Sequence, residues 1–239
     1  FEARTAQALA GISPRIMAAE ADGLLTVSAG RIAPTLRGRR FLNRLCARSP
    51  TFATPDKMTL LGFLGAVLVG LGYVLSNYDR NWLWLSVAAY FINWFGDSLD
   101  GSLARFRKIE RPDYGYFLDH SVDALAIIFI VGGLGLTPYM EFEVAAVPLL
   151  GYLLLAIHTF ISAKVMGEFQ LANAGAGPTE LRILLIAVTI AMWALGPRTV
   201  GYGTYTIFDA FGFVVGLILI GLYVVSTFTT AKRLRAKYS

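Results

Sequence analysis

Apolar residues gather in long runs along this chain, and short polar connections separate the runs. A membrane-spanning helix needs about 20 mostly apolar residues, and several stretches approach that length. The predicted spans cover approximately Met58–Leu75, Trp82–Leu103, Phe117–Leu136, Val144–Ala163, Leu181–Leu195 and Phe208–Thr229. The pattern therefore predicts an all-α, polytopic membrane protein whose six transmembrane helices form one domain over residues 53–239.

A different pattern precedes the first span, in the predicted N-terminal segment of residues 1–52. The stretch Leu36–Phe52 is basic, and its apolar residues fall near helical spacing: Leu36, Phe41, Leu42 and Leu45. This pattern is typical of an amphipathic helix that lies on a membrane surface. We expect a cytoplasmic, interfacial amphipathic segment.

Charge supports a membrane location. Of 239 residues, 56% are hydrophobic and 15% are charged, whereas a soluble domain carries about 25% charged residues. The composition therefore excludes a disordered chain and argues against a soluble globular enzyme. The net charge is +5, and most Lys and Arg residues lie before the first span, in the second and fourth connections and in the tail. Loops rich in Lys and Arg stay cytoplasmic, so we expect a multi-pass inner-membrane protein with both termini cytoplasmic and no nucleic-acid partner.

Four aspartates interrupt the second and third predicted spans: Asp97, Asp100, Asp119 and Asp123. Ionisable groups at membrane depth are costly and usually mark function. The members of each pair are three or four residues apart, so each pair occupies one face of its helix. A short polar connection makes the two helices antiparallel neighbours, and both pairs lie near the cytoplasmic side. We therefore expect the four carboxylates to converge.

Converging carboxylates repel one another unless a cation lies between them. Oxygen ligands without a nearby cysteine favour Mg²⁺ or Mn²⁺ over zinc, and four carboxylates suffice for two ions. Two-ion sites stabilise the attacking and leaving oxygens in phosphoryl transfer. Two other interpretations stay open at this point: the aspartates pair with interfacial arginines, or they form an ion relay in a cation or proton transporter.

Small residues and one arginine accompany the first aspartate pair. Gly101 and Ala104 lie on the same helical face as Asp97 and Asp100 because they continue its three- and four-residue spacing. Their lack of bulk allows either close helix packing or close approach of a ligand. Arg105 follows directly and suits a phosphate group. An ion path requires none of these three added residues, so the pattern favours an enzyme over a transporter.

The chain resembles the CDP-alcohol phosphotransferase family in one extended run: Asp97-x-x-Asp100-Gly101-x-x-Ala104-Arg105, nine further residues, then Gly115-x-x-x-Asp119-x-x-x-Asp123. The resemblance implies an enzyme of phospholipid synthesis, a transferase of substituted phosphate groups. Its donor would be CDP-linked, with CDP-diacylglycerol as the leading interpretation, its acceptor a hydroxyl group and its leaving product CMP. The runner-up is a CDP-amino-alcohol donor with a diacylglycerol-type lipid acceptor. The resemblance also implies a homodimer.

The family pattern implies roles for individual residues. The metal ligands would be Asp97, Asp100, Asp119 and Asp123. Asp123 would in addition be the catalytic base that takes the proton of the acceptor hydroxyl. The nucleotide and its phosphates would be bound by Asp100, Gly101, Ala104, Arg105 and Gly115.

A second family feature precedes the first span. Asp56 follows Pro55, and Thr59 stands three positions after Asp56. In the family, residues in this pattern help to bind cytidine. Pro-Asp at the start of a helix is equally typical of a helix cap, and the two roles are compatible.

Three residues are candidates for acceptor binding: His120, Lys164 and Arg182. Each has a simpler alternative, because the two basic residues also fit positive-inside anchoring and His120 also fits a packing role. His158 lies within an apolar run and is expected to be an interior histidine. Cys46 is the only cysteine, so it forms no disulfide within the chain and is expected to be a packing residue.

Overall fold

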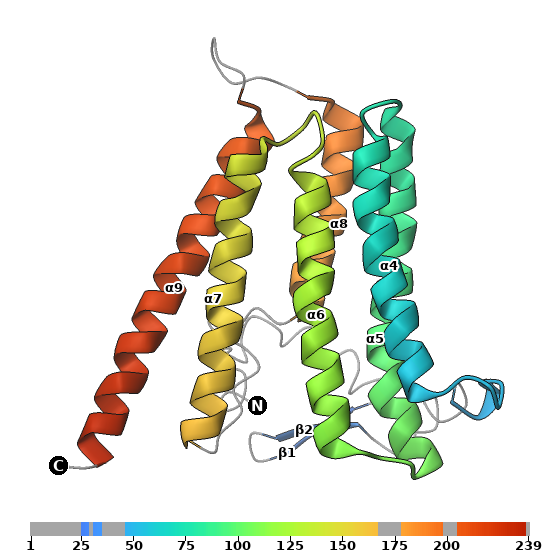
Figure 1. Ribbon diagram of the computed structural model, residues 1–239, viewed down its shortest axis with the longest axis vertical. Helices are drawn as coiled ribbons and strands as arrows, with labels where there is room; N and C mark the ends of the chain where they lie inside the picture. The colour runs from blue at the N-terminus through green and yellow to red at the C-terminus, as the bar shows by residue number, and fades with distance from the viewer. Residues whose placement is uncertain (1–24, 29–30, 35–45, 167–177, 198–204, 238–239) are drawn as a thin grey trace.

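The fold is a bundle of long helices with a small hairpin near one end (Figure 1). The computed structural model describes residues 25–28, 31–34, 46–166, 178–197 and 205–237. Its α-helices are α4 (Pro55–Leu75), α5 (Leu83–Arg107), α6 (Pro112–Leu134), α7 (Phe142–Met166), α8 (Pro178–Leu195) and α9 (Ile207–Lys237). The remaining elements are the 3₁₀ turn η1 (Arg80–Trp82) and the strands β1 (Leu25–Ser28) and β2 (Arg31–Pro34).

Each of the predicted spans falls on one of these α-helices. Two helices extend well beyond the apolar run that predicted them, because α6 begins at Pro112 and α9 ends at Lys237. Proline is favoured in the first turn of a helix, where its missing N–H would have no partner anyway, and this sets the start of α6. The sequence pattern therefore located the helices correctly but placed some of their ends too close to the apolar centre.

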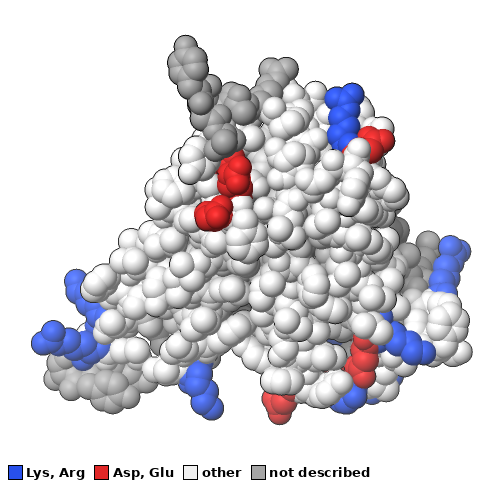
Figure 2. Space-filling model, turned by 45° about the horizontal axis from the view of Figure 1, so that its top comes forward, with Lys and Arg blue, Asp and Glu red and all other residues white. Residues whose placement is uncertain are grey.

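Four helices are long and apolar enough to cross a membrane: α4, α6, α7 over Phe142–Val165 and α9 over Ile207–Ala236. The apolar part of α8, Leu181–Leu195, is shorter. Helix α5 carries Asn93, Asp97 and Asp100 among its apolar residues, and it is not one of the four. Figure 2 shows Lys, Arg, Asp and Glu near the ends of the molecule and a broad belt without them between. The protein is therefore a helical membrane protein.

The N-terminal segment differs from the all-α expectation. Strands β1 and β2 pair antiparallel, with Leu25 opposite Pro34 and Thr26 opposite Ala33. Both strands contain β-branched residues, which favour extended backbone, and runs this short give no clear sequence signal. The amphipathic helix predicted over Leu36–Phe52 lies largely outside the described residues, which begin again at Cys46. Cys46 itself is 2% exposed, as expected of a packing residue.

Helix α4 packs closely against both α5 and α6, and glycines make this possible. A Cβ atom on Gly65 of α4 would lie 2.5 Å from the backbone nitrogen of Asn93 on α5. A Cβ atom on Gly133 of α6 would lie 2.6 Å from the Cα atom of Gly70 on α4. Real Cβ atoms do not approach so closely, so small residues allow these helix backbones to touch. The two aspartate-bearing helices are thereby fixed against the same helix.

A buried hydrogen-bond network ties α8 to this three-helix group. The hydroxyl of Tyr73 on α4 lies 3.1 Å from the hydroxyl of Tyr90 on α5. It also lies 2.7 Å from Oγ1 of Thr189 on α8. All three side chains are fully buried, and buried polar groups of this kind are costly unless they are paired. The network therefore specifies how α8 sits against α4 and α5.

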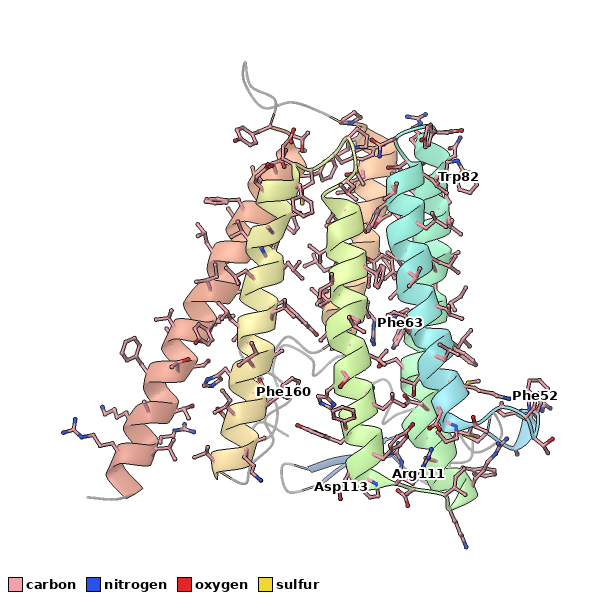
Figure 3. The ribbon with its side chains drawn as sticks, viewed as in Figure 1. Phe52, Phe63, Trp82, Arg111, Asp113 and Phe160 are labelled. Atoms are coloured by element: carbon pink, nitrogen blue, oxygen red, sulfur yellow. The ribbon has the colours of Figure 1, made fainter. Side chains whose placement is uncertain are left out.

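The two ends of the bundle carry different side chains. Figure 3 places Trp82 at one end and Arg111 and Asp113 at the other. Tyr78, Trp82 and Trp84 are 85%, 44% and 45% exposed. Exposed aromatic residues near a helix end are typical of a membrane–water interface. The aspartates of α5 and α6 lie toward the end of the bundle that carries Arg111.

Candidate active site

The candidate site forms where the last turns of α5 meet the first turns of α6, against the start of α4. Helix α5 ends at Arg107, and the next residue, Lys108, has a left-handed φ of 56° that turns the chain away. Four residues later Pro112 begins α6, so the two helices run antiparallel as predicted. They are not the closely packed neighbours that the sequence predicted, because each of them packs mainly against α4. This short reversal brings the aspartates of both helices to one end of the bundle.

Three of the four aspartates come together. Each of Asp97, Asp119 and Asp123 offers a carboxylate oxygen, and these oxygens lie within 4.8 Å of one another. All three residues are partly buried. Asp100 is not in this group of three; its Oδ2 accepts a hydrogen bond of 2.8 Å from Oγ1 of Thr59. We refer to Asp97, Asp119 and Asp123 as the aspartate cluster.

The aspartate cluster fits a hard divalent cation. Its donors are all carboxylate oxygens, which favour Mg²⁺ or Mn²⁺ over zinc. Oxygens within 4.8 Å of one another need to move little to share an ion, because magnesium–oxygen distances are about 2.0–2.1 Å. Asp100 sits one helical turn from Asp97, so a fourth carboxylate lies near the cluster.

One arginine already contacts the aspartate cluster. Nη2 of Arg182 on α8 lies 2.8 Å from Oδ2 of Asp97. Nε of Arg182 donates a hydrogen bond of 3.1 Å to Oδ1 of Asn93. Arg182 is thus close to the candidate site, as expected. Its guanidinium binds two residues of α5, Asp97 and Asn93. Asn93 was not a sequence candidate, although it lies one turn before Asp97 on the same helical face.

A cavity of about 340 Å³ opens beside Asp100 and Asp119. The start of α4, the end of α5, the α5–α6 connection and the start of α6 form its walls. All of the residues predicted to bind the nucleotide line it: Asp56, Thr59, Asp100, Gly101, Ala104, Arg105 and Gly115. The residues predicted from the sequence motifs and the cavity in the structure therefore coincide.

The cavity glycines are not needed for helix packing. A Cβ atom on Gly115 would meet nothing within 4 Å. A Cβ atom on Gly101 would lie 3.4 Å from Nη1 of Arg105, an ordinary contact with a flexible side chain. Of the two explanations for small residues here, close helix packing and room for a ligand, the geometry favours room for a ligand.

An ion pair joins two of the residues that line the cavity. Nη2 of Arg111 donates to Oδ1 of Asp56 at 2.6 Å, and this pairing raises the pKa of Arg111. The guanidinium also lies over the ring of Tyr114, 4.4 Å from its centroid. The cap of α4 is Thr54, whose side chain accepts from the backbone nitrogen of Lys57, so Asp56 is not the capping residue. The sequence analysis did not single out Arg111, because its partner Asp56 lies 55 residues away in the chain.

The other two acceptor candidates differ in placement. His120 lines the cavity, and its Nδ1 lies 3.6 Å from Oδ2 of Asp119. Its ring stacks on Tyr116, with centroids 4.2 Å apart, and meets the edge of Phe160 on α7. Lys164 is exposed and is not among the residues that line the cavity.

His158 has structural partners, as expected for an interior histidine. Its Nε2 lies 3.2 Å from Oγ of Ser162, and its Nδ1 lies 3.4 Å from Oγ1 of Thr227. The Ser162 contact lies within α7, and the Thr227 contact joins α7 to α9. Neither His158 nor these partners line the cavity.

Comparison with known proteins agrees with this geometry. The model of the CDP-alcohol phosphatidyltransferase family matches residues 52–228, well over half of the chain. The chain is 30% identical over 136 residues to an archaetidylinositol phosphate synthase of Pyrococcus horikoshii, an alignment that covers 56% of this chain and 68% of the relative. It is 37% identical over 84 residues to a phosphatidylinositol phosphate synthase of Cutibacterium acnes, covering 35% of this chain and 38% of that relative.

A solved structure shares the fold. The phosphatidylinositol phosphate synthase of Mycobacterium tuberculosis, crystallised with CDP-DAG bound, superposes with a TM-score of 0.54 at 19% identity. The superposition covers 83% of this chain and 92% of that protein. The family match takes in both aspartate-bearing helices and the start of α4. The chain belongs to the CDP-alcohol phosphatidyltransferase family, whose members are transferases of substituted phosphate groups.

Proposed function

We propose that this protein uses CDP-diacylglycerol as donor, transfers its phosphatidyl group to a hydroxyl acceptor and releases CMP. One observation carries the proposal: the aspartate cluster stands directly beside a cavity lined by every residue that the family motif assigns to the nucleotide. The P. horikoshii and C. acnes relatives carry the names of lipid-phosphate synthases, which supports a product of the same class.

In this proposal the carboxylates of Asp97, Asp119 and Asp123 hold a divalent cation, and Asp100 completes a second site. When bound there, divalent ions would supply positive charge that neutralises the diphosphate of the donor and the charge on the leaving phosphate. Asp123 takes the proton of the acceptor hydroxyl. The acceptor oxygen then bonds to the lipid-side phosphorus as the phosphorus–oxygen bond to CMP breaks.

The cavity residues bind the nucleotide half of the donor. Asp56 and Thr59 lie on the α4 wall, where they are proposed to contact cytidine. Arg105 extends from the α5 wall and supplies a planar, permanently charged group that matches a phosphate. Gly101 and Gly115 leave the wall free of side chains, so the diphosphate lies against backbone.

The acceptor is the least constrained partner. The names of the two relatives make an inositol phosphate the first acceptor to test. His120 lines the cavity and is proposed to orient the acceptor near Asp123. Arg182 and Lys164 stay candidates for an acceptor phosphate, with Arg182 the nearer because it contacts Asp97.

We propose that all six helices cross the membrane, with both termini and the cavity on the cytoplasmic side of an inner membrane. The α5–α6 connection and the last turn of α9 lie at the same end of the bundle (Figure 1). Both carry clusters of Lys and Arg, which favours a cytoplasmic location for that end. The family resemblance supports a homodimer in the membrane.

A direct assay tests the proposed function. The purified protein in lipid nanodiscs is given CDP-diacylglycerol, Mg²⁺ and a panel of inositol phosphate, glycerol phosphate, inositol, serine and diacylglycerol. We expect release of CMP with one acceptor and a new lipid of matching mass. The panel is repeated with CDP-choline and CDP-ethanolamine as donors. If CMP forms only with these donors and diacylglycerol, the donor assignment is wrong; if no combination releases CMP, the proposed function fails.

A further inference from the structure

Asn93 is a buried polar residue for which the proposed mechanism has no use. It lies in the middle of α5, four residues before Asp97, and is 5% exposed. Its Nδ2 donates a hydrogen bond of 2.9 Å to the carbonyl oxygen of Gly62 on α4. Its backbone nitrogen would lie 2.5 Å from a Cβ atom on Gly65, so α4 presses directly on this residue. Helix α4 therefore fixes the position of the Asn93 amide.

The orientation of that amide follows from its partners. A carbonyl oxygen accepts only, so the NH₂ group of Asn93 must face Gly62. The amide oxygen then faces Nε of Arg182, a donor, at 3.1 Å. A flipped amide would set oxygen against oxygen and N–H against N–H. Asn93 thus presents an acceptor toward α8 in a fixed direction.

Arg182 connects this fixed amide to the aspartate cluster. Its Nε binds Asn93 while its Nη2 binds Oδ2 of Asp97 at 2.8 Å. The side chain of Arg182 is 13% exposed, and that of Asp97 is 23% exposed. The guanidinium is planar and rigid, so fixing one edge by Asn93 fixes the direction of the other. A chain of contacts therefore runs from the α4 backbone through Asn93 and Arg182 to Asp97.

We propose that Asn93 and Arg182 are positioning residues that orient the carboxylate of Asp97 for the divalent cation. Arg182 holds Oδ2 of Asp97, and the carboxylate would bind the ion in the orientation that this contact fixes. Hydrogen-bonded partners behind a ligand fix its orientation, and their loss typically lowers metal affinity by about 10- to 100-fold. The inference rests on the proposed function, because it takes the aspartate cluster as the metal site.

The decisive variant is Asn93→Leu. Leucine has the same number and branching of side-chain heavy atoms as asparagine, and the substitution changes no charge. The control is Thr189→Val, which also removes a buried hydrogen bond between α8 and the bundle, the 2.7 Å contact with Tyr73, but away from the aspartates. The readout is binding of Mn²⁺ to the purified full chain, followed by electron paramagnetic resonance without donor or acceptor.

We expect Asn93→Leu to weaken Mn²⁺ binding by about 10-fold or more, and Thr189→Val to bind Mn²⁺ like the wild type. Arg182→Lys retains the positive charge but loses the planar guanidinium, so it should weaken Mn²⁺ binding similarly. If Asn93→Leu does not fold, Arg182→Lys provides the test. Wild-type affinity in the folded variants would overturn the proposal, as would an equal loss in Thr189→Val. So would Mn²⁺ affinity that stays normal in Arg182→Lys while the KM for the acceptor rises, because Arg182 would then bind acceptor only. Wild-type protein that binds Mn²⁺ but never releases CMP would refute the proposed function alone.

Discussion

Gly115→Ala separates the stability of the fold from binding of the nucleotide. Gly115 makes the first hydrogen bond of α6, from its backbone nitrogen to the carbonyl oxygen of Arg111, and it lines the cavity. A Cβ atom at this position meets no protein atom within 4 Å. The added methyl group therefore enters space that only a ligand would fill.

The two expected effects have opposite signs. Replacing glycine by alanine within a helix stabilises it by up to about 1 kcal/mol. Forcing an extra methyl group into a filled site costs about 1–3 kcal/mol. Since each 1.4 kcal/mol is tenfold in affinity, binding of CMP should weaken about 5- to 150-fold. The fold should gain or keep stability while the nucleotide is bound less tightly.

The assay is isothermal titration of CMP into the purified protein with Mg²⁺, alongside thermal unfolding, and it needs no acceptor. Gly132→Ala is the matched control, because Gly132 is also on α6, its Cβ atom would also meet nothing within 4 Å, and it does not line the cavity. The control should keep normal affinity for CMP. Equal affinities in the two variants would refute the placement of the nucleotide against Gly115, and a lower melting temperature for Gly115→Ala would refute the open geometry.

Three further predictions concern the base, the metal and the fold. Asp123→Asn should abolish CMP release while CMP still binds, because an amide keeps the shape of the carboxylate but takes no proton; activity and titration measure the two effects. Chelation by EDTA should abolish CMP release, and Mg²⁺ or Mn²⁺ should restore it where K⁺ does not, since only divalent charge compensates clustered carboxylates. Asp209→Asn should destabilise the protein by about 1–3 kcal/mol, seen in thermal unfolding, because one of two backbone N–H groups bound by Asp209 loses its acceptor.

Each of these has a clear contrary outcome. Normal turnover in Asp123→Asn would exclude that residue as the base. Full activity in EDTA, after removal of trace metal, would exclude a metal-dependent reaction. For Asp209, which is 3% exposed, the control is Glu143→Gln, the same change of carboxylate to amide at an exposed position of α7. An equal melting temperature in both variants and wild type would show that the Asp209 contacts to Thr206 and Glu141 do not stabilise the fold.

Local signals account for what the sequence predicted. The apolar runs are long enough to predict helices, and spacings of three and four residues place Asp97 and Asp100, then Asp119 and Asp123, on single helix faces. The short connection between α5 and α6 predicts that their aspartates lie at the same end of the bundle. The convergence of three of them also depends on the packing of both helices against α4. The residues that line the cavity were implied by the family resemblance: five by the aspartate motif, and Asp56 and Thr59 by the separate pattern at the start of α4.

Long-range contacts account for what it missed. Arg182 and Asn93 are 89 residues apart, and nothing in either local sequence shows that α8 packs against α5 at that height. The hydrogen bond between Thr59 and Asp100 joins residues 41 apart, and Asp100 lies outside the group of three. Strands β1 and β2 have four residues each, too few for a periodic signal. These features depend on tertiary packing. The local sequence allows each side chain or strand several contact partners, and only the packed structure selects one of them.

The most direct test of the central claim is an anomalous diffraction map from crystals grown with Mn²⁺ and a CDP-linked lipid. The account predicts a manganese peak between the carboxylates of Asp97, Asp119 and Asp123, with the diphosphate next to it and the cytidine in the cavity. A nucleotide bound in the cavity without any manganese at those carboxylates would contradict the account.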